Sequence, residues 1–288
     1  MFAITGITGQ VGGVVARHLL SAGHDVRAVV RNAAKGEVWA AQGCELAIAD
    51  MDDAPALERA STGVDGVFIL LPPNFDPSPG FVETRRTIAA VHAALARAKP
   101  TKVVCLSTIG AQAPQDNLLT ALRLMEESFS DLPMPIRILR AGWFMENAAW
   151  DVAAARDEGD IGSFLQPLDK PVPMVATADI GRLAAQLLQD TWNGRQVIEL
   201  EGPERVTPRQ LAASFSRVLG RDVGVHAVAR ETWETLFRSQ GMQYPAPRMQ
   251  MLDGFNEGWL EFEHGESGSL KGTTGIDVVL RAMVEQAS

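Results

Sequence analysis

Glycines gathered near the start of the chain have the spacing that most directly suggests chemistry. The stretch TGITGQVGG follows a short apolar run and contains Gly6, Gly9, Gly12 and Gly13. A glycine-rich turn between a first strand and a first helix aims backbone N–H groups at a pyrophosphate, at the positive end of the helix dipole. Because the spacing is G-x-x-G-x-x-G rather than G-x-G-x-x-G, two interpretations stay open: a nucleotide phosphate site, or a tight turn of any α/β domain.

The end of the second predicted strand indicates which nucleotide would bind. In dinucleotide-binding units an acidic residue about 20 positions beyond the glycines accepts the ribose 2′-hydroxyl, whereas an arginine accommodates a 2′-phosphate. Here HDVRAVVRN ends in Arg31 and Asn32, with Lys35 close by and no acidic residue at the tip. A charge-assisted contact of about 1.5–3 kcal/mol would favour NADP(H) over NAD(H) by about 10- to 100-fold. The alternative is that Arg31 is an ordinary exposed arginine.

Residues for other chemistry are sparse. A tyrosine activated by a lysine four positions later could protonate a developing alkoxide, but the single tyrosine, Tyr244, is followed at that position by Arg248, with two prolines between them. His264 stands among acidic residues without a second histidine nearby, so a solvated strand end is expected and no metal site is predicted. The absence of a G-x-S-x-G motif leaves a serine hydrolase unsupported.

Composition excludes several classes of protein. The chain has 288 residues, is 46% hydrophobic and carries a net charge of −9, which argues against nucleic-acid binding. Its longest apolar runs, such as residues 67–73, are too short to span a bilayer, and no targeting segment is recognised. Cys44 and Cys105 lie in unrelated contexts, so neither a disulfide nor a zinc site is predicted. We expect a cytoplasmic protein that acts on a small molecule, without a membrane or nucleic-acid partner; a homodimer stays open.

The elements that must position these residues alternate between strand and helix. Short runs rich in Val, Ile and Leu predict strands at FAIT, DVRAVV, CELAIA, GVDGVFILL, TKVVCLS and IRILRA. Amphipathic stretches lie between them, most clearly over residues 81–99. Several strands are apolar with little alternation, as parallel strands covered on both faces are. The pattern predicts an α/β fold built on a parallel sheet.

The pattern changes after about Trp150. Residues 166–173 are rich in proline, and TPRQLAASFSRVLG predicts a helix with Thr207 as N-cap and Gln210 completing a capping box. The last part of the chain is predicted to be mainly helical. We therefore assign residues 1–150 plus about 174–202 to an α/β domain that would bind NADP(H), and about 151–173 plus 203–288 to a smaller portion.

An ordered set of motifs carries a family resemblance. TGITGQVGG, AGHDVRAVVRN, ADMDD, CLSTIGA, LRAGWFMEN, TADIG and LEGPERVTPRQLA occur in this order, and SLKGTTGIDVVL extends the set almost to the C-terminus. Together they resemble the NmrA-like branch of the atypical short-chain dehydrogenase/reductases. That branch contains NADPH-dependent quinone reductases, isoflavone and ether reductases, and redox-sensing regulators. The resemblance implies a doubly wound parallel sheet with a small, mainly helical substrate portion.

The resemblance also implies where the cofactor would lie. The glycine turn would hold the pyrophosphate, the second strand the 2′-phosphate, the third strand end the adenine, and later strand ends the nicotinamide and its ribose. In that order the implied residues are Gly6, Thr8, Gly9, Gln10, Val11 and Gly12; Arg31 and Lys35; Asp50 and Met51; Leu71, Pro72, Ser107 and Thr108; and Gly142, Trp143 and Phe144.

The catalytic group is the least determined part. Ether reductases of the family carry a lysine on the helix after the fifth strand, but here no lysine occurs between Lys102 and Lys170. Ser107, Thr108 or Asn147 could donate a hydrogen bond to a substrate oxygen, or could serve the ribose and the local structure. Aromatic residues such as Trp143 and Trp150 (with Phe144 and Met145) could wall a pocket for a flat substrate or pack in the core. Two hypotheses follow: an NADPH-dependent reductase of quinones or enones, and an NADP(H)-binding redox sensor that acts through a protein partner without turnover.

Overall fold

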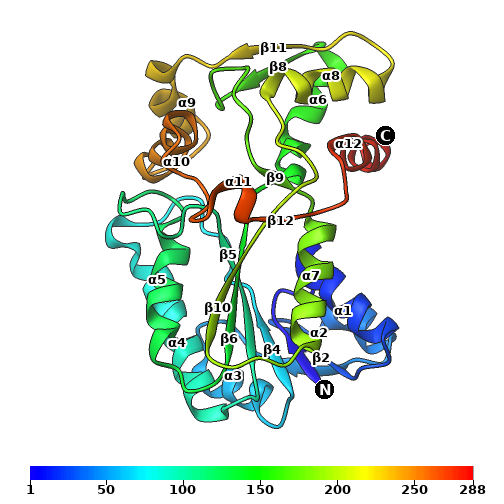
Figure 1. Ribbon diagram of the computed structural model, residues 1–288, viewed down its shortest axis with the longest axis vertical. Coiled ribbons are helices and arrows are strands. Elements are labelled where there is room, and N and C mark those ends of the chain that lie inside the picture. The colour runs from blue at the N-terminus through cyan, green and yellow to red at the C-terminus, as the bar shows by residue number, and fades with distance from the viewer. Residues whose placement is uncertain (288) are drawn as a thin grey trace.

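An eight-stranded parallel sheet organises the larger part of the molecule, with the strand order β12-β10-β6-β5-β4-β1-β2-β3 (Figure 1). The computed structural model describes residues 1–287. The strands of this sheet are β1 (Phe2–Ile4), β2 (Val26–Val30), β3 (Glu45–Ile48), β4 (Gly66–Ile69), β5 (Val103–Thr108), β6 (Ile136–Ala141), β10 (Arg195–Glu201) and β12 (Leu270–Lys271). The predicted doubly wound α/β fold is confirmed.

Helices cover both faces of the sheet (Figure 1). One face carries α1 (Gln10–Ser21), α2 (Ala33–Ala40) and α7 (Thr177–Gln189), and the other carries α3 (Ala54–Ser61), α4 (Val82–Ala98) and α5 (Thr120–Ser128). The central strands are therefore buried on both sides, as their continuous apolar sequences require. Within residues 1–287, none of the helices combines the length and apolar character needed to cross a bilayer.

Two glycines let α1 pack tightly against the turn and against α7. A Cβ on Gly12 would lie 2.3 Å from the carbonyl oxygen of Gly6, and a Cβ on Gly181 would lie 2.5 Å from the Cβ of Val14. A side chain at Gly12 would displace the turn at Gly6, and a side chain at Gly181 would displace α1 at Val14. These positions fix the start of α1 relative to the sheet.

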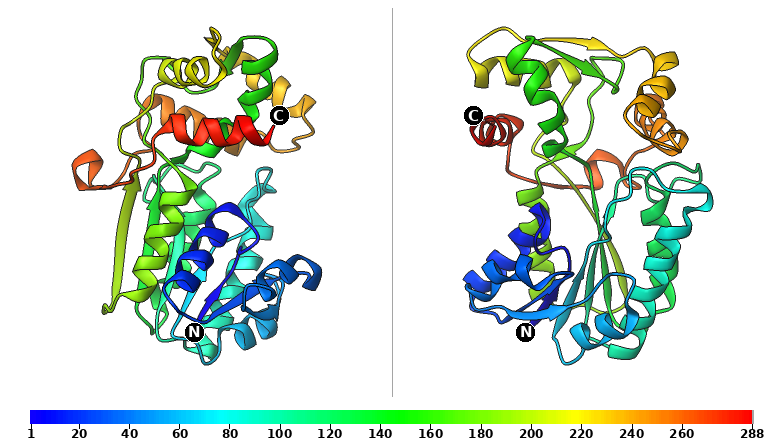
Figure 2. Two further views of the ribbon diagram at one scale, coloured as in Figure 1. Left: turned by 90° about the vertical axis from the view of Figure 1, so that its right-hand side faces the viewer. Right: turned by 180° about the vertical axis from the view of Figure 1, so that it is seen from behind.

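A smaller portion stands over the carboxyl edge of the sheet, and the two further views show the same arrangement (Figure 2). Its core is centred on large side chains that are fully buried, including Phe215, Trp233 and Phe237.

The remaining elements of the chain are η1 (Pro79–Phe81), η2 (Phe129–Asp131), β7 (Trp143–Phe144), η3 (Met145–Asp151), α6 (Val152–Asp157), β8 (Asp160–Ser163), β9 (Met174–Val175), α8 (Pro208–Leu219), β11 (Gly224–Ala227), η4 (Arg230–Thr232), α9 (Trp233–Ser239), α10 (Ala246–Glu257), α11 (Gly265–Gly268) and α12 (Ile276–Gln286). The capping box predicted for α8 is confirmed by reciprocal hydrogen bonds between Thr207 and Gln210.

The chain returns to the large sheet near its C-terminus. The two-residue strand β12 pairs with β10, so part of the segment assigned from the sequence to the smaller portion belongs to the main sheet. The buried carboxylate of Asp179 on α7 accepts hydrogen bonds from the backbone N–H groups of Thr273 and Thr274, each at 2.8 Å. This contact fixes the segment before α12 against the start of α7.

Candidate active site

The glycine turn after β1 presents the uncapped start of α1. Gly6 has φ +62°, a left-handed conformation that glycine adopts without strain. Gly9 is the N-cap of α1, and no side chain caps the helix. Thr8, Gly9 and Gln10 are exposed, whereas Val11 and Gly12 are buried against the sheet. The free N–H groups of this first helical turn form a cradle for an anion, and the close approach at Gly12 leaves no room for a side chain.

The second strand brings a positive charge to the same edge. Because β2 pairs with β1 in parallel, Arg31 and the glycine turn both follow strands that end at that edge. Arg31 is exposed and has no ion-pair partner among residues 1–287, while Asn32 caps α2 and Lys35 is exposed on its first turn. An anion cradle beside an unpaired arginine fits a dinucleotide that carries a 2′-phosphate.

Asp50 and Met51, the two residues after β3 that were predicted to flank the adenine, differ in exposure. Asp50 is exposed, and its Oδ1 accepts a hydrogen bond from the N–H of Asp52 at 3.1 Å. Met51 is only 7% exposed and packs in the core between the sheet and α3 and α4. Its side chain points into the core, so only Asp50 offers a side chain to a ligand in this structure.

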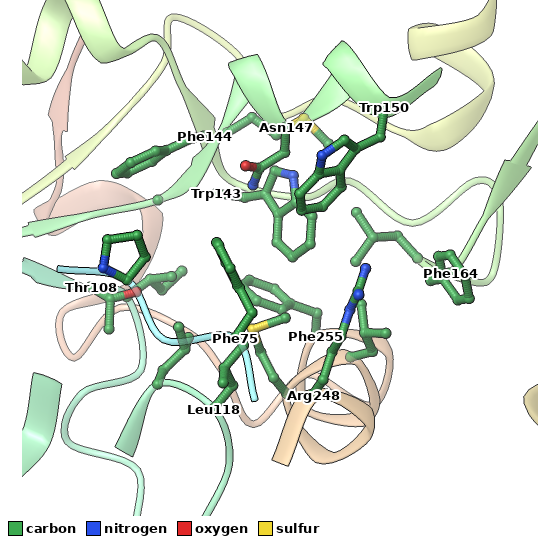
Figure 3. Close-up of a pocket in the computed structure, with 18 of the residues that line it drawn as sticks. Phe75, Thr108, Leu118, Trp143, Phe144, Asn147, Trp150, Phe164, Arg248 and Phe255 are labelled. Carbon is green, nitrogen blue, oxygen red and sulfur yellow. The ribbon is translucent and has the colours of Figure 1, made fainter. Parts of the chain in front are cut away.

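A cavity of about 870 Å³ opens between the sheet edge and the smaller portion (Figure 3). On the sheet side it is lined by strand-end residues that include Leu71, Pro72, Ser107, Thr108 and Gly142. On the other side it is lined by residues of the smaller portion, including Phe164, Met251 and Phe255. A volume of this size accommodates an organic ligand together with part of a cofactor.

Aromatic side chains form part of the walls of this cavity. Trp143 meets Phe255 edge to face, with ring centroids 5.3 Å apart, and Phe75 meets Trp150 in the same way at 6.3 Å. All four side chains predicted from the sequence as a wall line the cavity: Trp143, Phe144, Met145 and Trp150. Figure 3 shows these rings around an open centre, which suits a flat, conjugated ligand.

The polar candidates are placed differently from one another. Thr108 and Asn147 line the cavity and face its open centre (Figure 3). Ser107 also lines it but is 3% exposed, and its hydroxyl donates to Glu126 at 2.5 Å. The Ser107 hydroxyl proton is therefore already engaged, which leaves its oxygen only as an acceptor. Gly142 is buried, and a Cβ there would lie 2.5 Å from the carbonyl oxygen of Pro173.

Two charged residues of the cavity were not identified as site residues from the sequence. Burial raises the pKa of the Asp151 carboxyl to about 6, and the carboxyl has no hydrogen-bond or ion-pair partner among residues 1–287. Burial lowers the pKa of the Arg248 guanidinium, which enters the cavity from α10. Nothing in the local sequence marked either residue, since each belongs to a separate segment and only the fold brings both to one cavity.

The other residues considered from the sequence lie elsewhere. Tyr244 is 39% exposed and is not among the residues that line the cavity. The Nδ1 atom of His264 lies 3.4 Å from a carboxylate oxygen of Glu199. Within residues 1–287 no group of three His, Cys, Asp or Glu side chains could hold a metal ion.

The comparisons with known proteins agree with this geometry. The model of the NmrA-like family matches residues 1–258. The chain is a member of the NmrA-like family. The match includes the glycine turn, Arg31 and every cavity residue named above.

Relatives of this NmrA-like chain include proteins that are reductases by name. It is 30% identical over 249 residues to the (4-alkanoyl-5-oxo-2,5-dihydrofuran-3-yl)methyl phosphate reductase of Streptomyces griseus, covering 86% of this chain and 83% of that protein. It is 29% identical over 245 residues to quinone oxidoreductase 2 of Escherichia coli, covering 84% and 82%. The solved structure of Citrobacter sp. triphenylmethane reductase with NADP(H) shares the fold of this NmrA-like chain, with a TM-score of 0.80, 22% identity and coverage of 100% and 99%.

Proposed function

We propose that this NmrA-like chain is an NADPH-dependent reductase that transfers a hydride to a small, flat, conjugated acceptor such as a quinone or an enone. The observation that carries the proposal is the position of the cavity. It extends from the strand ends beside the glycine turn to the aromatic walls of the smaller portion. A nicotinamide at the carboxyl edge of the sheet would therefore share this cavity with a planar ligand.

The chain's own residues would hold the cofactor along this edge. The N–H groups at the start of α1 bind the pyrophosphate, and Arg31, with Lys35, binds the 2′-phosphate. The strand ends at Leu71 and Thr108 border the nicotinamide and its ribose. When bound, NADPH supplies the hydride. A relative named as an NAD(P)H azoreductase and the triphenylmethane reductase structure solved with NADP(H) support this assignment of a nicotinamide cofactor.

The walls of the cavity orient the acceptor and exclude water. Trp143 and Phe255 offer ring edges and faces to a planar ligand, and the side chains of Thr108 and Asn147 offer hydrogen bonds to its oxygen atoms. Reduction of a quinone also requires a proton. Asp151 supplies it, because its carboxyl lines the cavity and remains partly protonated near pH 6.

This chemistry does not need the tyrosine–lysine pair of many short-chain dehydrogenases. The single tyrosine of the sequence is Tyr244, which lies outside the cavity lining, and the residue four positions later is Arg248. We therefore place the chain among the atypical members and assign that role in this chain to positioning and to the carboxyl group of Asp151.

Turnover tests the proposal directly. The purified protein is mixed with NADPH, and the loss of NADPH is followed with a panel of quinones, enones and aldehydes. Oxidation that depends on a quinone or enone, faster with NADPH than with NADH, is the expected result. Tight binding of NADPH without turnover of any acceptor would reject the reductase and favour the redox sensor, which would act through a protein partner.

A further inference from the structure

Arg248 is the exception among the arginines that are not exposed. Every other buried or half-buried arginine of residues 1–287 forms an ion pair with a carboxylate, whereas Arg248 has no such partner. The paired arginines are Arg27, Arg123, Arg137, Arg140, Arg182 and Arg205. In this fold a carboxylate therefore balances the charge of each buried or half-buried arginine except Arg248, which lines the cavity.

The contacts that hold Arg248 are aromatic. Its guanidinium carbon lies 4.4 Å from the ring centroid of Phe237 and 5.5 Å from that of Trp150. Its one hydrogen-bond contact is weak, from Nη1 to the sulfur of Met242 at 3.8 Å. Figure 3 shows the side chain rising from α10 toward Trp150, beside Phe164. The rings fix the direction of the guanidinium but leave its N–H donors without a strong acceptor.

The rest of the cavity does not neutralise this charge. Asp151 is the acidic residue in the lining, and it forms no ion pair with Arg248 within the described chain. The polar residues Asn74, Asn147 and Gln240 are neutral. Because a guanidinium stays charged at any physiological pH, the cavity keeps a positive charge on the side opposite the sheet edge.

We infer that Arg248 binds an anionic substituent of the acceptor, a carboxylate, sulfonate or phosphate, so that the preferred substrates are planar conjugated molecules carrying such a group. The guanidinium presents paired donors that match the oxygens of these groups. The aromatic walls hold the conjugated part, and the anion lies against α10. This inference rests on the proposed function, since it assigns the substrate class of the same cavity.

The test compares one neutral and one anionic acceptor in matched variants. Values of kcat/KM with NADPH are measured for 1,4-naphthoquinone and for 1,4-naphthoquinone-2-sulfonate in the wild type, Arg248→Met, Arg248→Lys and Arg238→Met. Arg238 is an exposed arginine of α9 whose guanidinium pairs with Glu234, so its loss changes the net charge equally without touching the cavity. Intrinsic differences in reactivity cancel when the sulfonate-to-neutral ratio is compared between variants.

Arg248→Met is expected to lower this ratio at least about 10-fold, the effect of losing one charge-assisted interaction. Arg248→Lys keeps the charge and is expected to lower the ratio by less than Arg248→Met, while Arg238→Met leaves the ratio within about twofold of wild type. An Arg248→Met ratio equal to that of Arg238→Met overturns the inference while the proposed reductase stands. If Arg248→Met does not fold, as judged by its melting transition, Arg248→Gln removes the same charge and takes its place in the comparison with Arg238→Met.

A binding measurement separates the inference from the proposed function. Trp143 and Trp150 line the cavity, so quenching of tryptophan fluorescence reports ligand binding to the NADP⁺-saturated protein without turnover. The Kd of the sulfonate is expected to rise at least about 10-fold more than that of the neutral quinone in Arg248→Met. If no acceptor is reduced but this difference appears, the proposed function fails and the anion site stands. Equal changes in both Kd values overturn the anion site.

Discussion

The hydroxyl of Ser107, at the end of β5, donates a 2.5 Å hydrogen bond to the buried carboxylate of Glu126 on α5. The same carboxylate accepts two hydrogen bonds from the guanidinium of Arg140, at 3.0 and 2.8 Å. Arg140 in turn donates to Glu263 at 2.8 Å, so the network links the cavity edge to the segment before α11. Ser107 is thus held by the fold, which favours a positioning role over proton donation.

Replacing Glu126 by Gln should destabilise the fold. The amide leaves the buried guanidinium of Arg140 with less compensating charge, and breaking such a pair costs about 3 kcal/mol. The free energy of unfolding in urea measures this loss. Glu127→Gln is the matched control, because Glu127 lies on the same helix, is 59% exposed and is 3.6 Å from Arg123. If the two variants lose equal stability, the network does not stabilise the folded state.

The regular part of the fold was predictable because it depends on local pattern. The strand ends that border the cavity follow continuous apolar runs, and the capping box of α8 is written in four consecutive positions. The glycine turn, Arg31 and the strand-end residues could be placed for the same reason, since parallel strands carry their carboxyl ends to one edge.

What the sequence could not show depends on contacts between distant segments. β12 has two residues, too few for any periodicity, and it is a strand because it pairs with β10. Asp151 and Arg248 become site residues only when the smaller portion folds over the sheet. Met51 had the right position after its strand, but its side chain turned to the core rather than to the edge. The sequence pattern of a strand predicts where its last residues lie along the backbone, but it does not predict whether a side chain there points to the core or to the edge of the sheet.

Cofactor preference should depend on Arg31. Arg31→Ala removes the exposed guanidinium at the end of β2 and is expected to weaken NADPH binding about 10- to 100-fold relative to NADH. Titration calorimetry with both cofactors gives the ratio of the two Kd values. Arg59→Ala is the control, since Arg59 is exposed on α3 and lies away from the predicted phosphate sites. An unchanged NADPH-to-NADH ratio in Arg31→Ala would show that the 2′-phosphate is bound elsewhere.

The stability of the protein should respond to pH through Asp151. The pKa of this carboxyl is raised from 3.8 to about 6 in the folded chain, so the unfolded chain ionises first as the pH rises. The folded state therefore loses stability between about pH 4 and 6, by about 3 kcal/mol in total, and does not regain it at higher pH. Asp151→Asn should be more stable than wild type at pH 7.5 and not at pH 4, as measured by urea unfolding. The exposed Asp169→Asn should show no such difference, and an equal gain at both pH values would contradict the titration of Asp151.

The pH dependence of turnover should report the same carboxyl. If protonated Asp151 delivers the proton to the acceptor, kcat falls as the pH rises through about 6. Asp151→Asn should be slower below pH 6 and should lack this inflection, whereas Asp169→Asn should keep it. The profile is measured with saturating NADPH and one quinone. An inflection that survives in Asp151→Asn would assign the proton to another group.

The close approach at Gly12 should make this position intolerant of any side chain. A Cβ there would lie 2.3 Å from the carbonyl oxygen of Gly6, 2.6 Å from its carbonyl carbon and 2.9 Å from the nitrogen of Ile7. These are backbone atoms, so Gly12→Ala must displace either the turn or the start of α1, at a cost of about 1–3 kcal/mol. Because the displaced atoms form the predicted phosphate cradle, NADPH affinity should fall at least about 10-fold.

Gly275→Ala is the matched control for this prediction, because Gly275 precedes α12 with φ −79° and a Cβ there would meet nothing within 4 Å. Its stability should stay within about 1 kcal/mol of wild type and its NADPH affinity should not change. Thermal unfolding and calorimetric titration give both quantities for each variant. A Gly12→Ala protein that binds NADPH as tightly as Gly275→Ala would contradict the assignment of the phosphates to the glycine turn, because the methyl group must displace backbone atoms of that turn or of the start of α1.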